Sequence, residues 1–218
     1  MLKPATGNTI VMVLIGLSLT GCSIYDKYGY GKVADSLRDE EQTTPLELPA
    51  NAPSISQRFL PQGVSSKGEH KGFDILVRSE TPILAAADGV VSRVQTSFLY
   101  GRQVMIDHTG AETADGDRLQ TRYFHLSEKK VVAGEQVLRG QIIGYSGMSG
   151  MAGGFPHLHF EVHRLGDGPE AVAVRFLDPQ LFWADGVGRI TCYDSGREWP
   201  VEPLVLSYPV PCREVNWE

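Results

Sequence analysis

The sequence predicts a mostly β protein: an antiparallel sheet folded on itself, with short helices at most. Short runs of Val, Ile and aromatic residues recur along the chain, separated by Gly, Pro or charged residues. Because most of the 24 Gly and 13 Pro residues fall between these runs, we expect frequent turns and no long helices. A chain of 218 residues with 42% hydrophobic content can bury one core. The formal net charge of −6 argues against a nucleic-acid partner, which would require a basic face.

The expected strands follow one another from about residue 59 onward. They span residues 73–77, 83–86, 89–94, 103–107, 119–124, 137–145 and 157–163. The polar run TGAETADGDR at 109–118 is predicted to be a hairpin connection.

Two histidines separated by one residue, His157 and His159, begin the last of these strands. In a strand, residues two apart point to the same face, so both imidazoles are expected on one side. Leu158, Phe160 and Val162 would then face an apolar core. The preceding run is rich in glycine and ends in proline, which predicts a loop that forms a glycine-rich groove. An isolated pair of this kind is more often two exposed histidines, so the surrounding motifs decide its meaning.

Two further histidines lie at expected strand ends. His70 and Asp74 are four residues apart, but Gly68 and Gly72 make a helix unfavourable here. We therefore expect His70 to lie in a loop that folds back over the start of a strand. His125 ends the strand at 119–124, and taken alone it would be read as a structural histidine.

The N-terminus resembles a bacterial lipoprotein signal. Residues 10–19 are apolar but too short to span a bilayer of about 30 Å, which favours a signal peptide over residues 1–21. Leu-Thr-Gly-Cys at 19–22 resembles the lipobox, whose cysteine is lipidated, so a membrane anchor at Cys22 is expected. Ser23, rather than Asp, implies an outer-membrane lipoprotein facing the periplasm. A plain signal peptide or an uncleaved anchor is the alternative.

Two segments flank the expected domain. Residues 22–57 are polar and without period, which predicts a flexible tether. Residues 186–218 form a C-terminal extension of unassigned role that contains Cys192 and Cys212. In an exported protein these two cysteines are expected to form a disulfide, the alternative being two free buried thiols.

The histidine motifs, taken in order, resemble those of the LytM or lysostaphin-like zinc metallopeptidases, which cleave peptidoglycan cross-links. The matching motifs are H-x-x-x-D at 70–74, Y-x-H-L-S at 123–127 and H-L-H-F-E-V at 157–162. Weaker matches at 85–91, 104–108, 134–137 and 178–179 extend the resemblance over about residues 59–183. The resemblance implies a metallopeptidase domain over residues 58–185.

The resemblance implies that His70, Asp74 and His159 are ligands of Zn²⁺, with His125 and His157 as unligated active-site histidines. Two imidazoles, one carboxylate and one water form the open four-coordinate site of a catalytic zinc. No H-E-x-x-H motif occurs in the chain, so the glutamate base of other metalloproteases is absent. One of the two unligated histidines can act as the base, and the sequence leaves open which one.

Three other polar residues lie near these motifs. Glu161 and His163 follow the histidine pair on the same strand face. Glu161 could orient a ligand or serve a structural role, and His163 is expected to be exposed. His108 is expected to be structural.

These observations lead to two functional hypotheses. The first is a zinc endopeptidase that cuts peptide cross-links of peptidoglycan, of the D-Ala to diaminopimelate type if the outer-membrane location holds. The second is a non-catalytic module that activates other wall hydrolases, as related domains without metal ligands do. Retention of all five expected site residues favours the enzyme. Whether the tether or the C-terminal extension covers the groove stays open.

Overall fold

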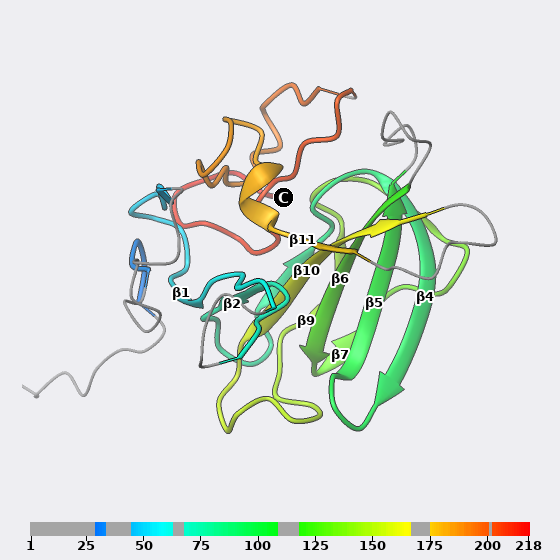
Figure 1. Ribbon diagram of the computed structural model, residues 1–218. Helices are drawn as coiled ribbons and strands as arrows, with labels where there is room; N and C mark the ends of the chain where they lie inside the picture. Colours follow the sequence, from blue (N-terminus) through cyan, green and yellow to red (C-terminus); the bar gives the residue numbers. More distant parts are fainter. Residues whose placement is uncertain (1–28, 34–44, 63–67, 109–117, 167–174, 201) are drawn as a thin grey trace, which may run out of the picture.

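The computed structural model describes residues 29–33, 45–62, 68–108, 118–166, 175–200 and 202–218 (Figure 1). Within these residues, the larger sheet is antiparallel, in the order β1-β2-β10-β6-β5-β4-β8, with β11 also paired to β10. Its strands are β1 (Ile55–Gln57), β2 (Phe73–Ile75), β4 (Gly89–Ser97), β5 (Gly101–His108), β6 (Arg118–Leu126), β8 (Gln136–Val137), β10 (Leu158–Leu165) and β11 (Arg175–Leu177). A second antiparallel sheet contains β3 (Pro82–Leu84), β9 (Ile142–Tyr145) and β7 (Glu128–Lys129) in the order β3-β9-β7. The prediction of a mostly β, antiparallel fold is confirmed.

The two sheets share one core. Leu158, Phe160 and Val162 alternate along β10 and are fully buried, which confirms the predicted apolar face of this strand. Ile83 of β3 and Ile143 of β9 belong to the same buried cluster, so the smaller sheet closes the apolar side of the larger one. The opposite face of β10 is therefore left for the histidines.

Helical structure is minimal, as predicted. The described residues contain one short 3-10 helix, η2 (Pro179–Leu181), which Asp178 caps by accepting a hydrogen bond from the Gln180 backbone N–H. The single strand expected over residues 137–145 is instead divided between β8 and β9. Gly140 has a φ of +81° in the turn between them, a conformation that favours glycine.

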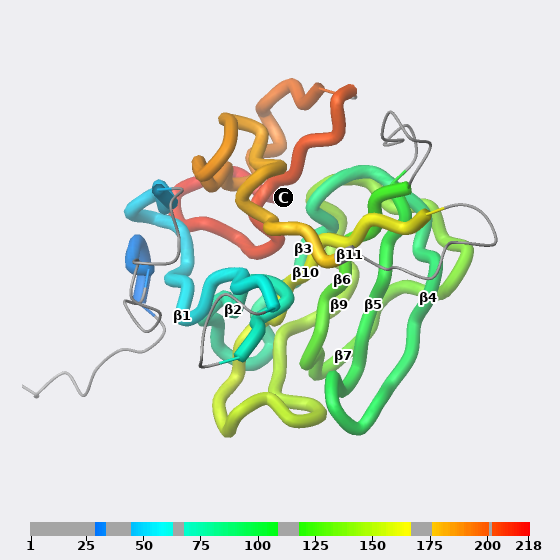
Figure 2. Tube along the Cα trace, viewed as in Figure 1, coloured from blue at the N-terminus to red at the C-terminus, as the bar shows by residue number. Residues whose placement is uncertain are grey.

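The prediction that residues 22–57 form a flexible tether is wrong for residues 45–57. Ile55 and Ala52 are fully buried, and β1 pairs with β2 at the edge of the larger sheet. The reason is a tertiary contact that no local period reveals. Residues 45–57 pack against residues 186–200 and 202–218, and we call these segments together the collar (Figure 2).

The collar is held by backbone bonds, by core side chains and by a disulfide. The Glu47 N–H donates to the Gly188 carbonyl at 2.7 Å, and the Tyr208 hydroxyl donates to the Pro53 carbonyl at 2.9 Å. Leu206 is fully buried in the common core. The predicted disulfide between Cys192 and Cys212 is confirmed. The C-terminal extension is thus part of the folded core and not a separate appendage.

Several predictions concern residues that the structure does not describe. The signal peptide at 1–21, the lipidated Cys22 and most of the 109–118 connection lie outside the described residues. In the part of the chain that is described, no helix has the length and apolar character needed to cross a membrane.

Candidate metal centre

Strands β2 and β10 bring the first and the last of the three histidine motifs together. Asp74 of β2 lies opposite His159 of β10 in the antiparallel register. Gly72 allows the chain before β2 to lie directly on β10, because a Cβ at this position would be 2.1 Å from the Phe160 carbonyl oxygen. The four-residue spacing of His70 and Asp74 thus produces a close pair without a helix, as predicted from the flanking glycines.

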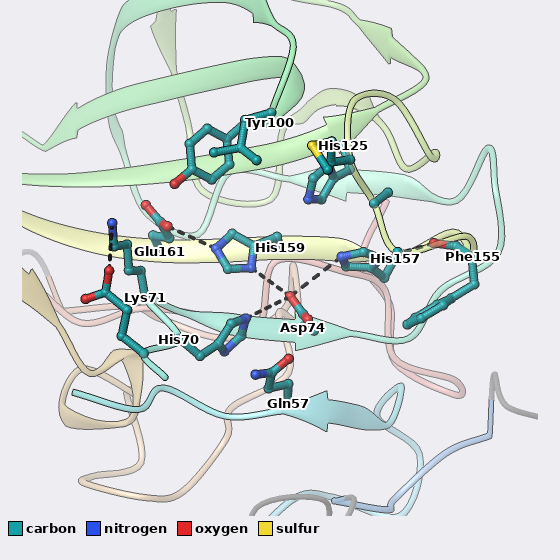
Figure 3. A pocket seen from close by; sticks show the side chains of 15 residues that line it. Gln57, His70, Lys71, Asp74, Tyr100, His125, Phe155, His157, His159 and Glu161 are labelled. Atoms are coloured by element: carbon teal, nitrogen blue, oxygen red, sulfur yellow. Dashed lines mark hydrogen bonds and ion pairs between the residues drawn. The ribbon is translucent and has the colours of Figure 1, made fainter. Parts of the chain in front are cut away.

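Three imidazoles surround the Asp74 carboxylate (Figure 3). Asp74 Oδ1 lies 2.7 Å from His159 Nδ1, 3.3 Å from His70 Nε2 and 3.6 Å from His157 Nε2. The donor atoms of His70, Asp74 and His159 all lie within 4.8 Å of one another, a separation that one metal ion can bridge. The structure therefore gathers the three residues expected as ligands into a single site.

The outer nitrogens of the two candidate ligand histidines are bonded to acceptors. His70 Nδ1 lies 2.7 Å from the Arg58 carbonyl oxygen, and His159 Nε2 lies 2.9 Å from Glu161 Oε1. A carbonyl or carboxylate oxygen can only accept, so each of these nitrogens carries the proton and donates it. In the neutral ring, the inner nitrogen then directs its lone pair toward Asp74. Two lone pairs and one carboxylate converging on one point form a donor set suited to a divalent cation.

The other two histidines follow the same arrangement. His157 Nδ1 donates to the Phe155 carbonyl at 3.1 Å, and His125 Nδ1 donates to the Ser149 carbonyl at 2.8 Å. The His125 and His157 rings are 4.9 Å apart, and both line the same cavity. Their remaining nitrogens are available for proton transfer beside the metal position.

His125 reaches this cavity through an unusual backbone conformation. Tyr123 belongs to the core and the Phe124 ring lies 5.5 Å from that of His159, so strict alternation would turn His125 toward the core. Its φ of +61° is left-handed, which places two successive side chains on the cavity side. Such conformations are enriched at functional sites, and no sequence pattern signals this one.

The electrostatics of the site favour positive charge next to Asp74. Burial alone would raise the pKa of Asp74, but hydrogen bonds from His159 and His70 hold that pKa well below its usual range. Burial would lower the pKa of His159, yet hydrogen bonds to Asp74 and Glu161 raise it to about 9. A cation bound between His159 and Asp74 would take the place of the proton held there. The residues present therefore fit a metal ion.

The cavity at this site measures about 430 Å³. One wall is the predicted glycine-rich loop, represented by Met151, Gly153 and Phe155, and the Leu99–Tyr100 turn also lines the cavity. The Met151 N–H donates to the Leu99 carbonyl at 2.9 Å, which joins the loop to the turn. The described part of the C-terminal extension does not line the cavity, so that part does not cover the groove.

The structure also tests the predictions made for the two histidines outside the site, His108 and His163. His108 is structural as predicted, because Nδ1 donates to the Asp88 carbonyl at 2.8 Å and Nε2 lies 2.9 Å from the Thr121 hydroxyl. The prediction that His163 is exposed is wrong. Its side chain is fully buried, because β11 pairs with β10 beside it and the Phe176 ring packs on it at 4.7 Å.

Several residues that no sequence motif indicated also line the cavity, among them Tyr100 and Gln57. Tyr100 lies in the β4–β5 turn with its ring 4.7 Å from that of Phe124, and Gln57 lies in the segment assigned to the tether. The supporting carbonyls of Arg58 and Ser149 were missed as well. Backbone groups have no residue-type signal, so only the structure could identify them.

Comparison with known proteins finds a matching family and several similar chains. Residues 68–172 match the model of peptidase family M23. The chain is 33% identical over 165 residues to the peptidoglycan DD-endopeptidase ShyA of Vibrio cholerae, an alignment that covers 72% of this chain and 36% of ShyA. It is 43% identical over 95 residues to an uncharacterized metalloprotease of Haemophilus influenzae, covering 43% of this chain and 18% of that protein. Among solved structures, LytU is similar with 31% identity and a TM-score of 0.47, covering 58% of this chain and 81% of LytU.

The chain spans about a third or less of these two curated relatives. The family match includes each of the five expected site residues, from His70 to His159. Residues 68–172 of this chain therefore belong to peptidase family M23.

Proposed function

We propose that this chain is a zinc-dependent endopeptidase that hydrolyses peptide cross-links of peptidoglycan. The observation that carries the proposal is the convergence of the inner nitrogens of His70, His157 and His159 on Asp74, with each outer nitrogen bonded to an acceptor. The names of relatives support the substrate, since ShyA and ShyC of Vibrio cholerae are both called peptidoglycan DD-endopeptidases.

Zinc would be held by His70 Nε2, Asp74 Oδ1 and His159 Nδ1. Two nitrogens and one oxygen leave a fourth position open, as in catalytic zinc sites. When bound, the ion supplies Lewis-acid chemistry, because it polarises the scissile carbonyl and lowers the pKa of a water molecule.

The proton transfers fall to His125 and His157. Burial lowers the pKa of His125 to about 4, against a hydrogen bond to the Ser149 carbonyl that raises it, so its ring is neutral near pH 7. A neutral imidazole can take the proton of the attacking water, and an imidazole that carries a proton can deliver it to the leaving amine. The two rings lie 4.9 Å apart, so they can divide these steps across one substrate bond.

A non-catalytic role as an activator of other hydrolases is less well supported. Such a role requires neither the hydrogen bonds that orient each imidazole nor the left-handed φ that turns His125 into the cavity. A cavity of about 430 Å³ with all five residues in place is what hydrolysis needs.

The test is digestion of purified cross-linked peptidoglycan by a chain that begins at residue 23. We expect dimeric muropeptides to become monomers, cleavage to stop with a chelator, and zinc to restore it. Mass analysis would identify the bond, which we propose is D-Ala to diaminopimelate. Intact dimers despite one zinc per chain would overturn the endopeptidase proposal.

We also propose that Cys22 is lipidated and that the protein faces the periplasm from the outer membrane. The support is the sequence around residues 10–23, whose structure is not described. Labelling with radioactive palmitate checks the anchor: the full chain should incorporate label, and Cys22→Ser should not.

A further inference from the structure

Two buried polar residues continue the line of histidines behind His159 on the same face of β10. Glu161 has 2% of its surface exposed and His163 has none. Glu161 Oε1 lies 2.9 Å from His159 Nε2, and Glu161 Oε2 lies 2.5 Å from His163 Nε2. Each carboxylate oxygen thus receives one imidazole N–H, and the row His163–Glu161–His159 runs along this face of β10 from the part paired with β11 to the metal position.

We propose that Glu161 and His163 are positioning residues that fix the tautomer and orientation of His159 and thereby set the affinity of the site for zinc. This inference rests on the proposed metal site. If His159 Nε2 carries a proton that Glu161 accepts, the lone pair of the neutral ring must lie on Nδ1, which faces Asp74. Without that acceptor, the proton could occupy either nitrogen and the ring could rotate.

The geometry requires a carboxylate and not merely a polar side chain at position 161. Two N–H groups point at it, so it must present two acceptor atoms. An amide of the same shape would present one oxygen and one NH₂ group, and the NH₂ group would face a donor. Burying a carboxylate is costly unless it is paired. Here Arg122 lies directly opposite Glu161 on β6 and offsets part of that cost.

The side chain of His163 forms its hydrogen bond with Glu161. Its Nε2 bonds to the carboxylate, whereas Nδ1 is buried with no partner among the described residues. The ring also packs edge-on against Phe176. Phenylalanine would supply that packing with no unpaired nitrogen, so the contact that only histidine adds is the bond to Glu161. His163 therefore holds the carboxylate in place for His159.

The experiment measures zinc affinity of the full chain by competition with a chromogenic chelator at neutral pH. We expect Glu161→Gln to weaken binding by about 10- to 100-fold, the usual effect of losing an outer-shell partner of a metal ligand. His163→Phe keeps the packing and should weaken binding by a smaller factor of about 3 to 10. Glu128→Gln is the matched control, because Glu128 is exposed and bonds Lys130 away from the cavity.

A second readout separates positioning from a structural role. The ¹⁵N shifts of His159 in the zinc-loaded protein should report one tautomer in wild type, with the proton on Nε2, and a mixture in Glu161→Gln. Circular dichroism checks that each variant is folded, and His163→Phe carries the test if Glu161→Gln does not fold. Folded variants that bind zinc within twofold of wild type would overturn this inference alone. A wild-type chain that binds no zinc would overturn the proposed function as well.

Discussion

Strands β5 and β6 carry a buried histidine at each end of their shared ladder, and the two ends use the imidazole differently. At one end, both nitrogens of His108 are bonded within the protein, to the Asp88 carbonyl and the Thr121 hydroxyl. At the other end, His125 Nδ1 donates to the Ser149 carbonyl while the ring faces His157 across the cavity. A buried histidine is thus structural or functional according to what its second nitrogen meets.

The largest expected effect comes from a substitution at the end of the ladder that borders the cavity, which we call the cavity end. Asp74→Ala removes the carboxylate on which the imidazoles converge, so we expect loss of bound zinc and a fall in hydrolysis of about 10³-fold or more. Zinc content by atomic absorption and muropeptide release check this. His108→Gln is the control. It lies at the other end of the ladder, the closed end, where both imidazole nitrogens are bonded within the protein, and it should keep one zinc per chain. A metal-loaded Asp74→Ala chain would contradict the ligand assignment.

A somewhat smaller effect separates metal binding from proton transfer within the cavity. His125→Ala and His157→Ala should each lower kcat by about 10²- to 10⁴-fold, the usual contribution of general acid–base catalysis. Zinc content should stay unchanged, because neither ring is needed to complete the three-donor set. If either variant lost its zinc, that histidine would have to be counted as a ligand.

The two ends also differ in how far the sequence predicts them. The H-x-H pair, the flanking glycines and the alternation of Leu158 and Phe160 are local signals, and they predicted the strand faces correctly. The tautomer of each ring depends on backbone carbonyls, such as that of Arg58, which the fold supplies from distant segments. His163 was misplaced for a similar reason, since the strand that covers it, β11, was not anticipated.

The collar was the least predictable region. Ile55 and Leu206 are buried by contacts between the two flanking segments of the domain, and these segments have no hydrophobic period. Tertiary packing decides their structure, whereas composition alone had suggested a tether for residues 22–57 and no assignment for residues 186–218. Only the cysteine pair gave a sequence signal of the arrangement.

Removing the disulfide tests whether the protein can lose stability and still retain its peptidase activity. The double variant Cys192→Ser/Cys212→Ser removes a cross-link between two residues with a sequence separation of 20. We expect the free energy of unfolding to fall by about 3 kcal/mol in the chain-entropy model. Denaturant unfolding measures this. Peptidase activity at low temperature should stay within twofold, because neither cysteine lines the cavity. A large loss of activity in the folded variant would instead link the collar to catalysis.

The smallest expected effect is a pH dependence of the unfolding free energy, caused by His108 at the closed end. Burial lowers the pKa of His108 to about 4, against the hydrogen bond to the Asp88 carbonyl that raises it, with Arg139 and Asp107 as weaker charged neighbours. The unfolded chain, with an ordinary pKa of about 6.5, binds more protons between these values. The contribution of neutral His108 is therefore complete above about pH 6.5, is lost progressively as pH falls below that value, and is fully lost once pH has fallen through about 4.

A paired measurement isolates that contribution from the other groups that titrate in the same range. His108→Gln keeps hydrogen-bonding groups for Asp88 and Thr121 but has nothing to protonate. Between pH 7 and pH 5, wild type should lose about 2 kcal/mol more unfolding free energy than His108→Gln. Subtracting the two curves removes the titration of His125, which both chains share. Parallel curves would mean that His108 binds a proton in the fold as readily as in the unfolded chain, and its second nitrogen would then no longer distinguish the closed end from the cavity.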